Sequence, residues 1–473
     1  MIALTLAEVA AITGGRVEDG DPALTVSGPA FLDSRRPEPA GLFAASAGER
    51  ADGHDFARQA VEGGAAAVLG TRATGVPTVV VPDTRAALQE LARVVLARLR
   101  ADGGGPGVVA LTGSQGKTST KDLLAEVLGA HGPTVATHGS FNNEWGLPLT
   151  VLRATAQTRH LVLEMGARGI GHLRELCRVA PPDISVVLNV GKAHLGEFGS
   201  QENIALAKGE LVEALGPDGT AVLNVDDRLV AAMARRTEAP VLGFGRGEVA
   251  DVRLGEVVLD DLGRPTFTLH HRGASVEVPL QLLGAHQAMN AAAAAAAAVA
   301  AGLDLADAGA ALRAVRSLSP MRMELHERPD GLVVVNDAYN ANPDSMRAAL
   351  EALAGMGERS GRRTVAVLGV MRELGDAHEA EHAAVGRLAR SLGVDVVLTV
   401  GEDARPLHTG ARPGADTPGE AHWVGSVDEA VAWLGQNVSG SDLLLVKASR
   451  GARLERVVDG LLTHDGDRKE AGA

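Results

Sequence analysis

The sequence predicts an α/β protein with mostly parallel sheets and three domains. Short, almost continuous apolar runs alternate with helical patterns along most of the chain, and strands buried on both faces of a parallel sheet produce such runs. With 473 residues, the chain is also too long for one ordinary core. We therefore expect a smaller N-terminal domain at 1–100, a linker at 101–107, a central domain at 108–318 and a C-terminal domain at 319–473.

The N-terminal domain is expected to combine short strands with one long helix. A strand pattern lies near Leu24–Val26. Apolar residues then recur at helical spacing over Leu88–Leu99 with arginines between them, as on a helix packed on one face. Residues 101–107 are rich in glycine and break every periodicity, which is typical of a linker.

The central domain repeats a strand-then-helix rhythm. Its expected strands are Val108–Thr112, Leu161–Met165, Ile184–Val190 and Thr220–Val225. Between Val252 and Leu282 the pattern changes to strict alternation, which predicts an antiparallel ribbon added to the parallel sheet. The run Ala291–Ala301 is nearly all alanine and too short to cross a bilayer, so we expect a tightly packed helix there.

The C-terminal domain shows the same rhythm and is expected to be Rossmann-like. Its expected strands are Leu332–Val335, Thr364–Leu368, Val394–Val400 and Leu443–Val446, and a helix is expected at Pro343–Ala354. The tail after His464 is polar, and we expect it to be frayed.

Composition excludes several classes of partner. The chain carries 45 basic and 59 acidic residues, a net charge of −14, and only 2% aromatic residues, which argues against nucleic-acid binding. We read no signal peptide and no membrane insertion, and expect a cytoplasmic monomer. The single cysteine, Cys177, excludes an intramolecular disulfide and fits a reducing compartment. Such a cysteine is usually just buried.

The most informative motif lies between the first central strand and a helical pattern at Leu123–Leu128. In Gly113–Ser119 the glycines let the backbone approach an anion, and unpaired N–H groups at the helix start face it. Lys117 supplies positive charge and the Thr118 hydroxyl is able to bind magnesium. The loop is short, because Gly113 lies only four positions before the lysine. We expect a P-loop mononucleotide-binding domain; the alternative is an ordinary glycine turn.

Four features follow at places where phosphate-loop enzymes need reactive groups. Glu164 ends a predicted strand, where a carboxylate either faces a nucleotide's magnesium or is a solvated cap. His194 follows the third central strand, although an isolated histidine is more often structural. Lys208 lies in a helix with an apolar stripe, where a lysine is usually a surface residue. The turn Gly284–Asn290 either meets a ligand or caps the alanine helix.

Two polar clusters lie outside the central domain. Asn336–Met346 places amides, carboxylates and the only tyrosine of the chain between a strand and a helix, which is more than capping requires. Asp33–Arg36, followed by Asp52–Phe56, is the other cluster, and it is equally explained as a charged loop.

Taken together, these strings resemble the Mur ligase family, the ATP-dependent amide-bond ligases of bacterial cell-wall precursor synthesis. The loop TGSQGKT is similar to the family's TGxxGKT, which folylpolyglutamate synthases share. The longer strings are SFNNEWGLPLTVL at Ser140–Leu152, NVGKAHLGEFGS at Asn189–Ser200, NDAYNANPDSM at Asn336–Met346 and VKASRGARLE at Val446–Glu455. They follow the family's order and cover nearly the whole chain.

Within the family, the strings are most similar to those of the ligase that joins D-alanyl-D-alanine to UDP-N-acetylmuramoyl-tripeptide through an acyl phosphate. The resemblance implies ATP and Mg²⁺, these two small-molecule substrates, and a role in peptidoglycan synthesis and hence in cell shape and cell division. The alternatives are a sister ligase that adds the third amino acid, a folylpolyglutamate synthase, or a P-loop ATPase that is not a ligase.

The resemblance also implies a role for individual residues. ATP would contact Gly113, Ser114, Gln115, Gly116, Lys117, Thr118, Ser119, Asn290, Arg322, Asp337, Tyr339 and Asn340. The UDP-linked substrate would contact Ser34, Arg35, Asn142 and Asn143, and the amine substrate Lys447, Ser449 and Arg450. Catalysis would depend on Lys117, Glu164, His194 and Lys208, and the metal on Thr118, Glu164, His194 and Lys208. Lys208 would be carbamylated, which requires the neutral amine that desolvation favours.

Overall fold

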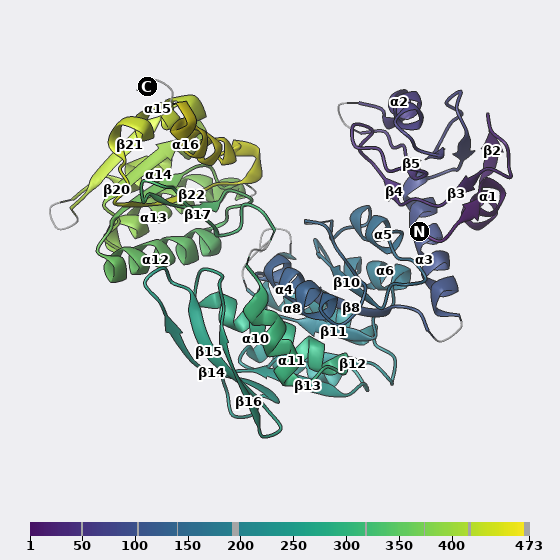
Figure 1. The fold of residues 1–473 in the computed structure, drawn as a ribbon, viewed down its shortest axis with the longest axis horizontal. Helices are drawn as coiled ribbons and strands as arrows, with labels where there is room; N and C mark the ends of the chain where they lie inside the picture. The colour runs from purple at the N-terminus through teal and green to yellow at the C-terminus, as the bar shows by residue number, and fades with distance from the viewer. Residues whose placement is uncertain are drawn as a thin grey trace.

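The computed structural model describes residues 1–48, 51–101, 104–139, 141–191, 198–316, 319–372, 374–414 and 418–467. Within these residues the strands form three large sheets and one two-stranded pair. Figure 1 shows the N-terminal lobe (purple) and the C-terminal lobe (green to yellow) on opposite sides of the central lobe (teal). The prediction of an α/β protein with mostly parallel sheets is therefore confirmed.

The N-terminal lobe contains a five-stranded sheet in the order β2, β7, β6, β5, β4. Only β2 runs antiparallel to its neighbour. Its elements are β1 (Leu4–Thr5), α1 (Leu6–Thr13), β2 (Arg16–Glu18), β3 (Thr25–Val26), β4 (Ala30–Phe31), β5 (Leu42–Ala44), α2 (Ala57–Glu62), β6 (Ala67–Gly70), β7 (Thr78–Val80) and α3 (Thr84–Arg100). The carboxylate of Asp83 starts α3 by accepting hydrogen bonds from the N–H groups of Arg85 and Ala86.

The central lobe contains a nine-stranded sheet in the order β16, β15, β14, β13, β12, β11, β8, β10, β9. Its strands are β8 (Gly107–Thr112), β9 (Thr134–Ala136), β10 (His160–Glu164), β11 (Ile184–Val187), β12 (Thr220–Asn224), β13 (Val241–Gly245), β14 (Val252–Leu259), β15 (Pro265–His271) and β16 (Ala274–Pro279). The seven strands β8 to β14 run parallel to one another. β15 pairs antiparallel with both β14 and β16. The predicted ribbon is therefore confirmed.

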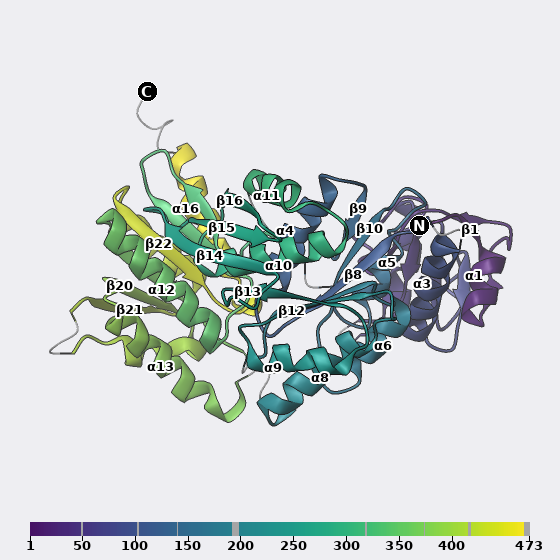
Figure 2. The same cartoon turned by 90° about the horizontal axis from the view of Figure 1, so that it is seen from below.

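Helices cover both faces of the central sheet (Figure 2). They are α4 (Lys117–Gly129), α5 (Gly146–Val151), α6 (His172–Val179), α8 (Gln201–Glu213), α9 (Arg228–Ala231), α10 (His286–Ala300) and α11 (Leu305–Ala314). One core cluster contains residues of α4, α10 and α11, and another contains residues of α5, α6 and α8. The alanines at 291–298 are fully buried, so α10 is the tightly packed helix that the sequence predicts. The second cluster continues through α3 into the N-terminal lobe.

The C-terminal lobe contains a six-stranded sheet in the order β17, β18, β22, β19, β20, β21. Its elements are β17 (Glu324–Glu327), β18 (Val333–Asp337), α12 (Pro343–Ser360), β19 (Arg363–Leu368), α13 (His378–Ser391), β20 (Val396–Val400), α14 (Arg405–Ala411), β21 (Glu420–Val424), α15 (Val427–Asn437), β22 (Asp442–Lys447) and α16 (Glu455–Asp467). Only β17 is antiparallel to its neighbour.

Some element boundaries differ from the prediction. β11 ends at Val187 rather than at Val190, because Asn189 leaves the sheet and binds the phosphate loop. α16 continues past His464 to Asp467. Among the helices of the described residues, none is long and apolar enough to cross a membrane.

Candidate functional site

The phosphate loop joins β8 to α4, as the sequence predicts. Gly116 has a φ of 76°, and a Cβ atom there would lie 2.5 Å from Oδ1 of Asn290 on α10. Only glycine meets both demands. Lys117 donates a hydrogen bond from Nζ to the carbonyl of Gly113 at 2.8 Å. The Lys117 side chain therefore folds back over the loop, and Gly116 packs directly against Asn290 near the start of the alanine helix.

Asn189 supports this loop, a role that the sequence analysis did not assign. Its Oδ1 atom accepts hydrogen bonds from the N–H groups of Ser114 and Gln115 at 3.0 and 2.9 Å. The Ser114 hydroxyl in turn accepts one from the N–H of Gly191 at 2.9 Å. In the sequence, the sign of this role is that Asn189 is polar and directly follows the apolar part of the predicted strand that ends at Leu188. The last two residues of the motif, Thr118 and Ser119, belong to α4. Thr118 is buried and Ser119 is half-buried.

Glu164 lies at the end of β10, next to the strand that leads into the loop. Its side chain is 1% exposed, so it is not the solvated cap of the alternative interpretation. Oε1 accepts a hydrogen bond from Nδ2 of Asn142 at 2.7 Å, whereas Oε2 is buried and has no hydrogen-bond partner among the described residues. A buried carboxylate oxygen without a partner is unfavourable unless a cation neutralises it.

Lys208 is buried on α8, contrary to the usual expectation for a lysine in such a helix. It is 5% exposed, and no hydrogen bond or ion pair joins its side chain to another described residue. Burial, and secondarily the charge of Lys117, hold the pKa of Lys208 well below its ordinary value. The lysine is therefore set up to carry a neutral amine.

The electrostatics of Lys117 connect the central and C-terminal lobes. Burial lowers the pKa of Lys117, the nearby carboxylate of Glu164 raises it, and the guanidinium of Arg322 lowers it further. The charge of Lys117 also affects the pKa of Lys208. Four predicted site residues therefore interact electrostatically beside the loop: Lys117, Glu164, Arg322 and Lys208.

The helix that carries Lys208 is held by a second carboxylate. Glu210 is buried and accepts hydrogen bonds from the N–H groups of Gly171 and Arg174 at 2.6 and 3.2 Å. These N–H groups lie at the start of α6, where a carboxylate is favourable. The position of Lys208 is thereby coupled to that of α6.

A second polar cluster lies at the carboxyl ends of β18 and β22. Asp337 and Lys447 pair in register, and Nζ of Lys447 lies 2.6 Å from Oδ2 of Asp337 and 2.8 Å from the carbonyl of Asn340. The Arg322 guanidinium lies 4.1 Å from the centre of the Tyr339 ring. This cation–π contact joins Arg322 to Tyr339, two residues that the resemblance places at ATP.

His286 lies near Asp337 and Lys447 of the second cluster, although nothing in the sequence indicated a role for this residue. It is the first residue of α10. Leu283, three residues earlier in the chain, is buried in the hydrophobic core of the C-terminal lobe. Farther along α10, Asn290 donates from Nδ2 to Oε1 of Gln287 at 2.9 Å. The start of α10 therefore faces the C-terminal cluster as well as the loop.

The residues expected at the amine substrate already have protein partners. The Ser449 hydroxyl accepts a hydrogen bond from the N–H of Arg372 at 3.0 Å and donates to the carbonyl of Ala341 at 3.3 Å. Arg450 forms an ion pair of 2.9 Å with Glu455. These contacts hold the segment after β22 against the start of α12.

The predicted UDP-contacting residues lie in two places. Ser34 and Arg35 follow β4 in the N-terminal lobe, where Arg35 forms an exposed ion pair of 2.8 Å with Asp33. Among the described residues, no hydrogen bond or ion pair joins Ser34 or Arg35 to the phosphate loop. Asn143, by contrast, follows Asn142 beside Glu164 and caps α5 by accepting a hydrogen bond from the N–H of Gly146 at 2.9 Å.

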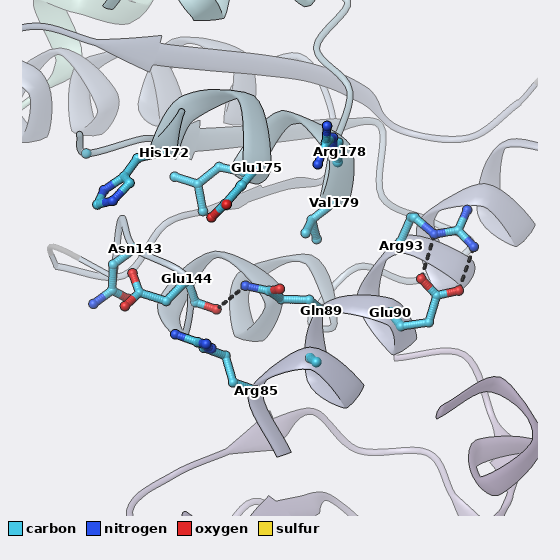
Figure 3. Close-up of a pocket in the computed structure, with 13 residues that line it drawn as sticks. Arg85, Gln89, Glu90, Arg93, Asn143, Glu144, His172, Glu175, Arg178 and Val179 are labelled. Atoms are coloured by element: carbon cyan, nitrogen blue, oxygen red, sulfur yellow. Dashed lines mark hydrogen bonds and ion pairs between the residues drawn. The ribbon is translucent and has the colours of Figure 1, made fainter. Parts of the chain in front are cut away.

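A cavity of about 570 Å³ lies between α3 and α6, and Asn143 is among its lining residues (Figure 3). It is lined by side chains of both the N-terminal and the central lobe. His194 lies outside the described residues. Within the described part of the chain, no three His, Cys, Asp or Glu side chains gather as a metal cluster.

Three domain families match the chain: the Mur ligase family catalytic domain at 31–99, the Mur ligase middle domain at 111–298 and the Mur ligase glutamate ligase domain at 321–450. A UDP-N-acetylmuramoyl-tripeptide--D-alanyl-D-alanine ligase from Mycobacterium tuberculosis is 47% identical over 98% of this chain and 99% of its own length.

Solved structures agree with this similarity. UDP-N-acetylmuramoylalanyl-D-glutamyl-2,6-diaminopimelate--D-alanyl-D-alanyl ligase from Acinetobacter baumannii matches with a TM-score of 0.82 and 29% identity, covering 97% of this chain and 98% of that one. MurF ligase from Thermotoga maritima in complex with ADP matches with a TM-score of 0.77 and 29% identity, covering 93% and 98%. With sequence and fold similar along almost the whole length, the chain belongs to the Mur ligase family.

Proposed function

We propose that this chain joins D-alanyl-D-alanine to UDP-N-acetylmuramoyl-tripeptide in an ATP-dependent step of peptidoglycan synthesis. The geometric observation that carries the proposal is the buried carboxylate of Glu164 at the end of β10, which pairs in register with the end of β8, directly before the phosphate loop and Lys117. The lowered pKa of buried Lys208, to which the charge of Lys117 contributes, agrees with it. The relative from Mycobacterium tuberculosis, whose name states this reaction, favours these substrates over those of a sister ligase or a folylpolyglutamate synthase. It also disfavours an ATPase that is not a ligase.

ATP would bind between the central and C-terminal lobes. The N–H groups at the start of α4 and the ammonium of Lys117 favour its phosphates, because both present positive charge to an anion. Arg322 would also face the phosphates. Asn290 would approach the adenine, and Asp337 the ribose, with Tyr339 and Asn340 beside it.

The side chains beside the loop fit a magnesium ion. Glu164 offers a buried oxygen that has no partner in the described part of the chain, Thr118 offers a hydroxyl, and oxygen donors are those that magnesium prefers. When bound, magnesium would offset the negative charge of the transferring phosphoryl group. The lowered pKa of Lys208 favours its neutral amine, which would add carbon dioxide and release a proton to give a carbamate, a further anionic oxygen ligand. His194 remains a predicted ligand.

The reaction would proceed in two steps. A carboxylate oxygen of the tripeptide attacks the γ-phosphorus of ATP, so that ADP leaves and an acyl phosphate forms. The amine of D-alanyl-D-alanine then attacks the acyl carbon, the bond from that carbon to the phosphate oxygen breaks, and phosphate leaves as the amine loses a proton. Lys117 and Arg322 reduce the repulsion between the two anions that meet in the first step.

The other two lobes would position the substrates. Ser34 and Arg35 would contact the uridine nucleotide, and Asn142 and Asn143 the sugar or its diphosphate. The segment after β22, with Lys447, Ser449 and Arg450, would orient the amine: Lys447 and Ser449 through the contacts that fix the segment, and Arg450 from its exposed position. Holding the amine against a short-lived acyl phosphate requires orientation and exclusion of water. We also propose that the enzyme acts as a monomer in the cytoplasm.

The experiment that tests this function measures ADP release with defined substrates. UDP-N-acetylmuramoyl-tripeptide and D-alanyl-D-alanine are supplied together, each alone, and in parallel with UDP-linked dipeptide plus amino acids and with folate plus glutamate. We expect sustained ADP release only with the tripeptide and D-alanyl-D-alanine together. Sustained release with the dipeptide nucleotide, with folate, or with ATP alone would reject the assignment.

A further inference from the structure

The cavity between α3 and α6 lies next to the proposed reaction centre. Its lining includes Asn143 and Gly166. Asn142, the neighbour of Asn143 in the chain, donates its hydrogen bond to Glu164, and the N–H of Gly166 donates to the carbonyl of Asn142 at 2.8 Å. One end of the cavity is therefore built by the same backbone that holds the carboxylate of the proposed metal site. A volume of about 570 Å³ lies within the range of small-molecule sites, roughly 300–1,000 Å³.

The cavity carries charges of both signs that have no partner among the described side chains. Arg85 on α3 and Arg178 on α6 are exposed and form no ion pair with a described residue, and the same holds for exposed Glu175 and half-buried Glu144. Figure 3 shows Glu175 descending from α6 toward the wall that carries Glu144 and Arg85. At the far end of the cavity the situation differs, because Arg93 bonds Glu90 twice, at 2.8 and 2.6 Å.

Unpaired acidic and basic groups in one cavity match a ligand that carries both charges. An ammonium alone would satisfy the glutamates and leave the arginines without a counter-ion. A carboxylate alone would satisfy the arginines and leave the glutamates without a counter-ion. A group with an ammonium and a carboxylate on one carbon satisfies both sets, and hydrogen bonds between charged groups are the stronger ones.

The third residue of the acceptor tripeptide is able to carry such a group. The carboxylate that reacts belongs to its third residue, so the side chain of that residue must extend from the region beside Glu164. The Acinetobacter baumannii ligase is named for a tripeptide ending in 2,6-diaminopimelate, whose side chain ends in an ammonium and a carboxylate on one carbon. Building on the proposed function, we propose that this cavity binds that end of a 2,6-diaminopimelate third residue. Arg85 binds the carboxylate, and Glu144 and Glu175 bind the ammonium.

The test compares two UDP-linked tripeptides, one ending in 2,6-diaminopimelate and one ending in lysine, which keeps the ammonium and lacks the carboxylate. ADP release with D-alanyl-D-alanine gives kcat/KM for each. The native enzyme should prefer diaminopimelate about 10- to 100-fold, because a hydrogen bond between charged groups contributes on that order. Arg85→Met should lower the ratio of the two kcat/KM values at least tenfold, and Arg85→Lys should restore part of it.

Two further variants make the test specific. Glu175→Gln should lower kcat/KM for both tripeptides, because both carry the ammonium. Arg98→Met is the matched control, since Arg98 is an exposed arginine on the same helix that pairs with Glu8 outside the cavity; its ratio should equal that of the native enzyme. If both tripeptides are used and Arg85→Met leaves the ratio unchanged, the inference is overturned and the proposed function stands. If neither tripeptide releases ADP, the proposed function fails.

Discussion

Asn142 donates a hydrogen bond from Nδ2 to Oε1 of Glu164 at 2.7 Å. The bond joins a residue expected at the UDP-linked substrate to a residue expected at the metal. It occupies one oxygen of the carboxylate, while the other, Oε2, is buried and makes no hydrogen bond to any residue that the structure describes. A shift of the segment that carries Asn142 would therefore reorient the carboxylate as well.

Replacing Asn142 should weaken the metal site. In Asn142→Ala the carboxylate of Glu164 loses the group that orients it, so we expect kcat to fall about 10- to 100-fold, in the range of lost supporting contacts around metal ligands. The Mg²⁺ concentration that gives half-maximal ADP release should rise. A variant with native kcat and native Mg²⁺ dependence would contradict this role of Asn142.

Lys208 should be required for turnover and replaceable by an added anion. In Lys208→Ala the amine that forms the carbamate is missing and the proposed metal loses an anionic ligand, so we expect ADP release to fall more than about 100-fold. Millimolar formate or acetate should restore part of it by occupying the vacated space. Full activity in the alanine variant would remove the carbamate from the mechanism.

Asp337 and Lys447 should stabilise the C-terminal lobe as a pair. Both side chains are largely buried, at 15% and 3% exposed, so Asp337→Asn leaves a buried ammonium without its counter-ion. Breaking such a pair costs about 3–5 kcal/mol, which urea denaturation of the variant should detect. The double variant Asp337→Asn/Lys447→Met should recover much of this loss. Equal stability of the native protein and Asp337→Asn would show that the pair contributes nothing.

Cys177 should be unreactive in the folded protein. Burial, and secondarily the charge of Glu210, raise the pKa of its thiol to about 12. From an ordinary value of 9.0 this leaves about a thousandfold less thiolate near pH 8, because each pKa unit is a factor of ten. A thiol reagent should react with the unfolded chain and hardly at all with the native one.

The same shift fixes the sign of a pH effect on stability. Between about pH 9 and pH 12 the unfolded chain has lost the thiol proton and the native chain retains it. The free energy of unfolding should therefore fall as the pH rises through this window. Cys177→Ala lacks this thiol. The free energy of unfolding of the native protein minus that of the variant should therefore fall as the pH rises through this range, and stay constant outside it. A constant difference would contradict the raised pKa.

The central elements of the fold follow from local pattern, and the edges do not. β8, β10, β12 and β22 are continuous apolar runs because both their faces are covered. The edge strands β17 and β21 are only partly buried and consist of ELHE and EAHWV. Because they pair on one side only, their sequences need no apolar run, and no strand was predicted there.

The site was predictable to the extent that each residue sits at a strand end or helix start. Glu164 and the phosphate loop are of this kind. Lys208 is not, because its burial depends on which face of α8 meets the sheet, and its lowered pKa depends also on Lys117, which is distant in the sequence. The cavity between α3 and α6 was also beyond prediction, since it joins Arg85 to Glu175 across two lobes.

The central claim is that the tripeptide is activated as an acyl phosphate beside Lys117 and Glu164. The most direct measurement uses UDP-N-acetylmuramoyl-tripeptide with both reacting carboxylate oxygens labelled with ¹⁸O, incubated with ATP and D-alanyl-D-alanine. Mass spectrometry of the released phosphate should find one ¹⁸O per molecule, because the attacking oxygen leaves with phosphorus when the amine displaces it. Amide product formed together with unlabelled phosphate would contradict the mechanism.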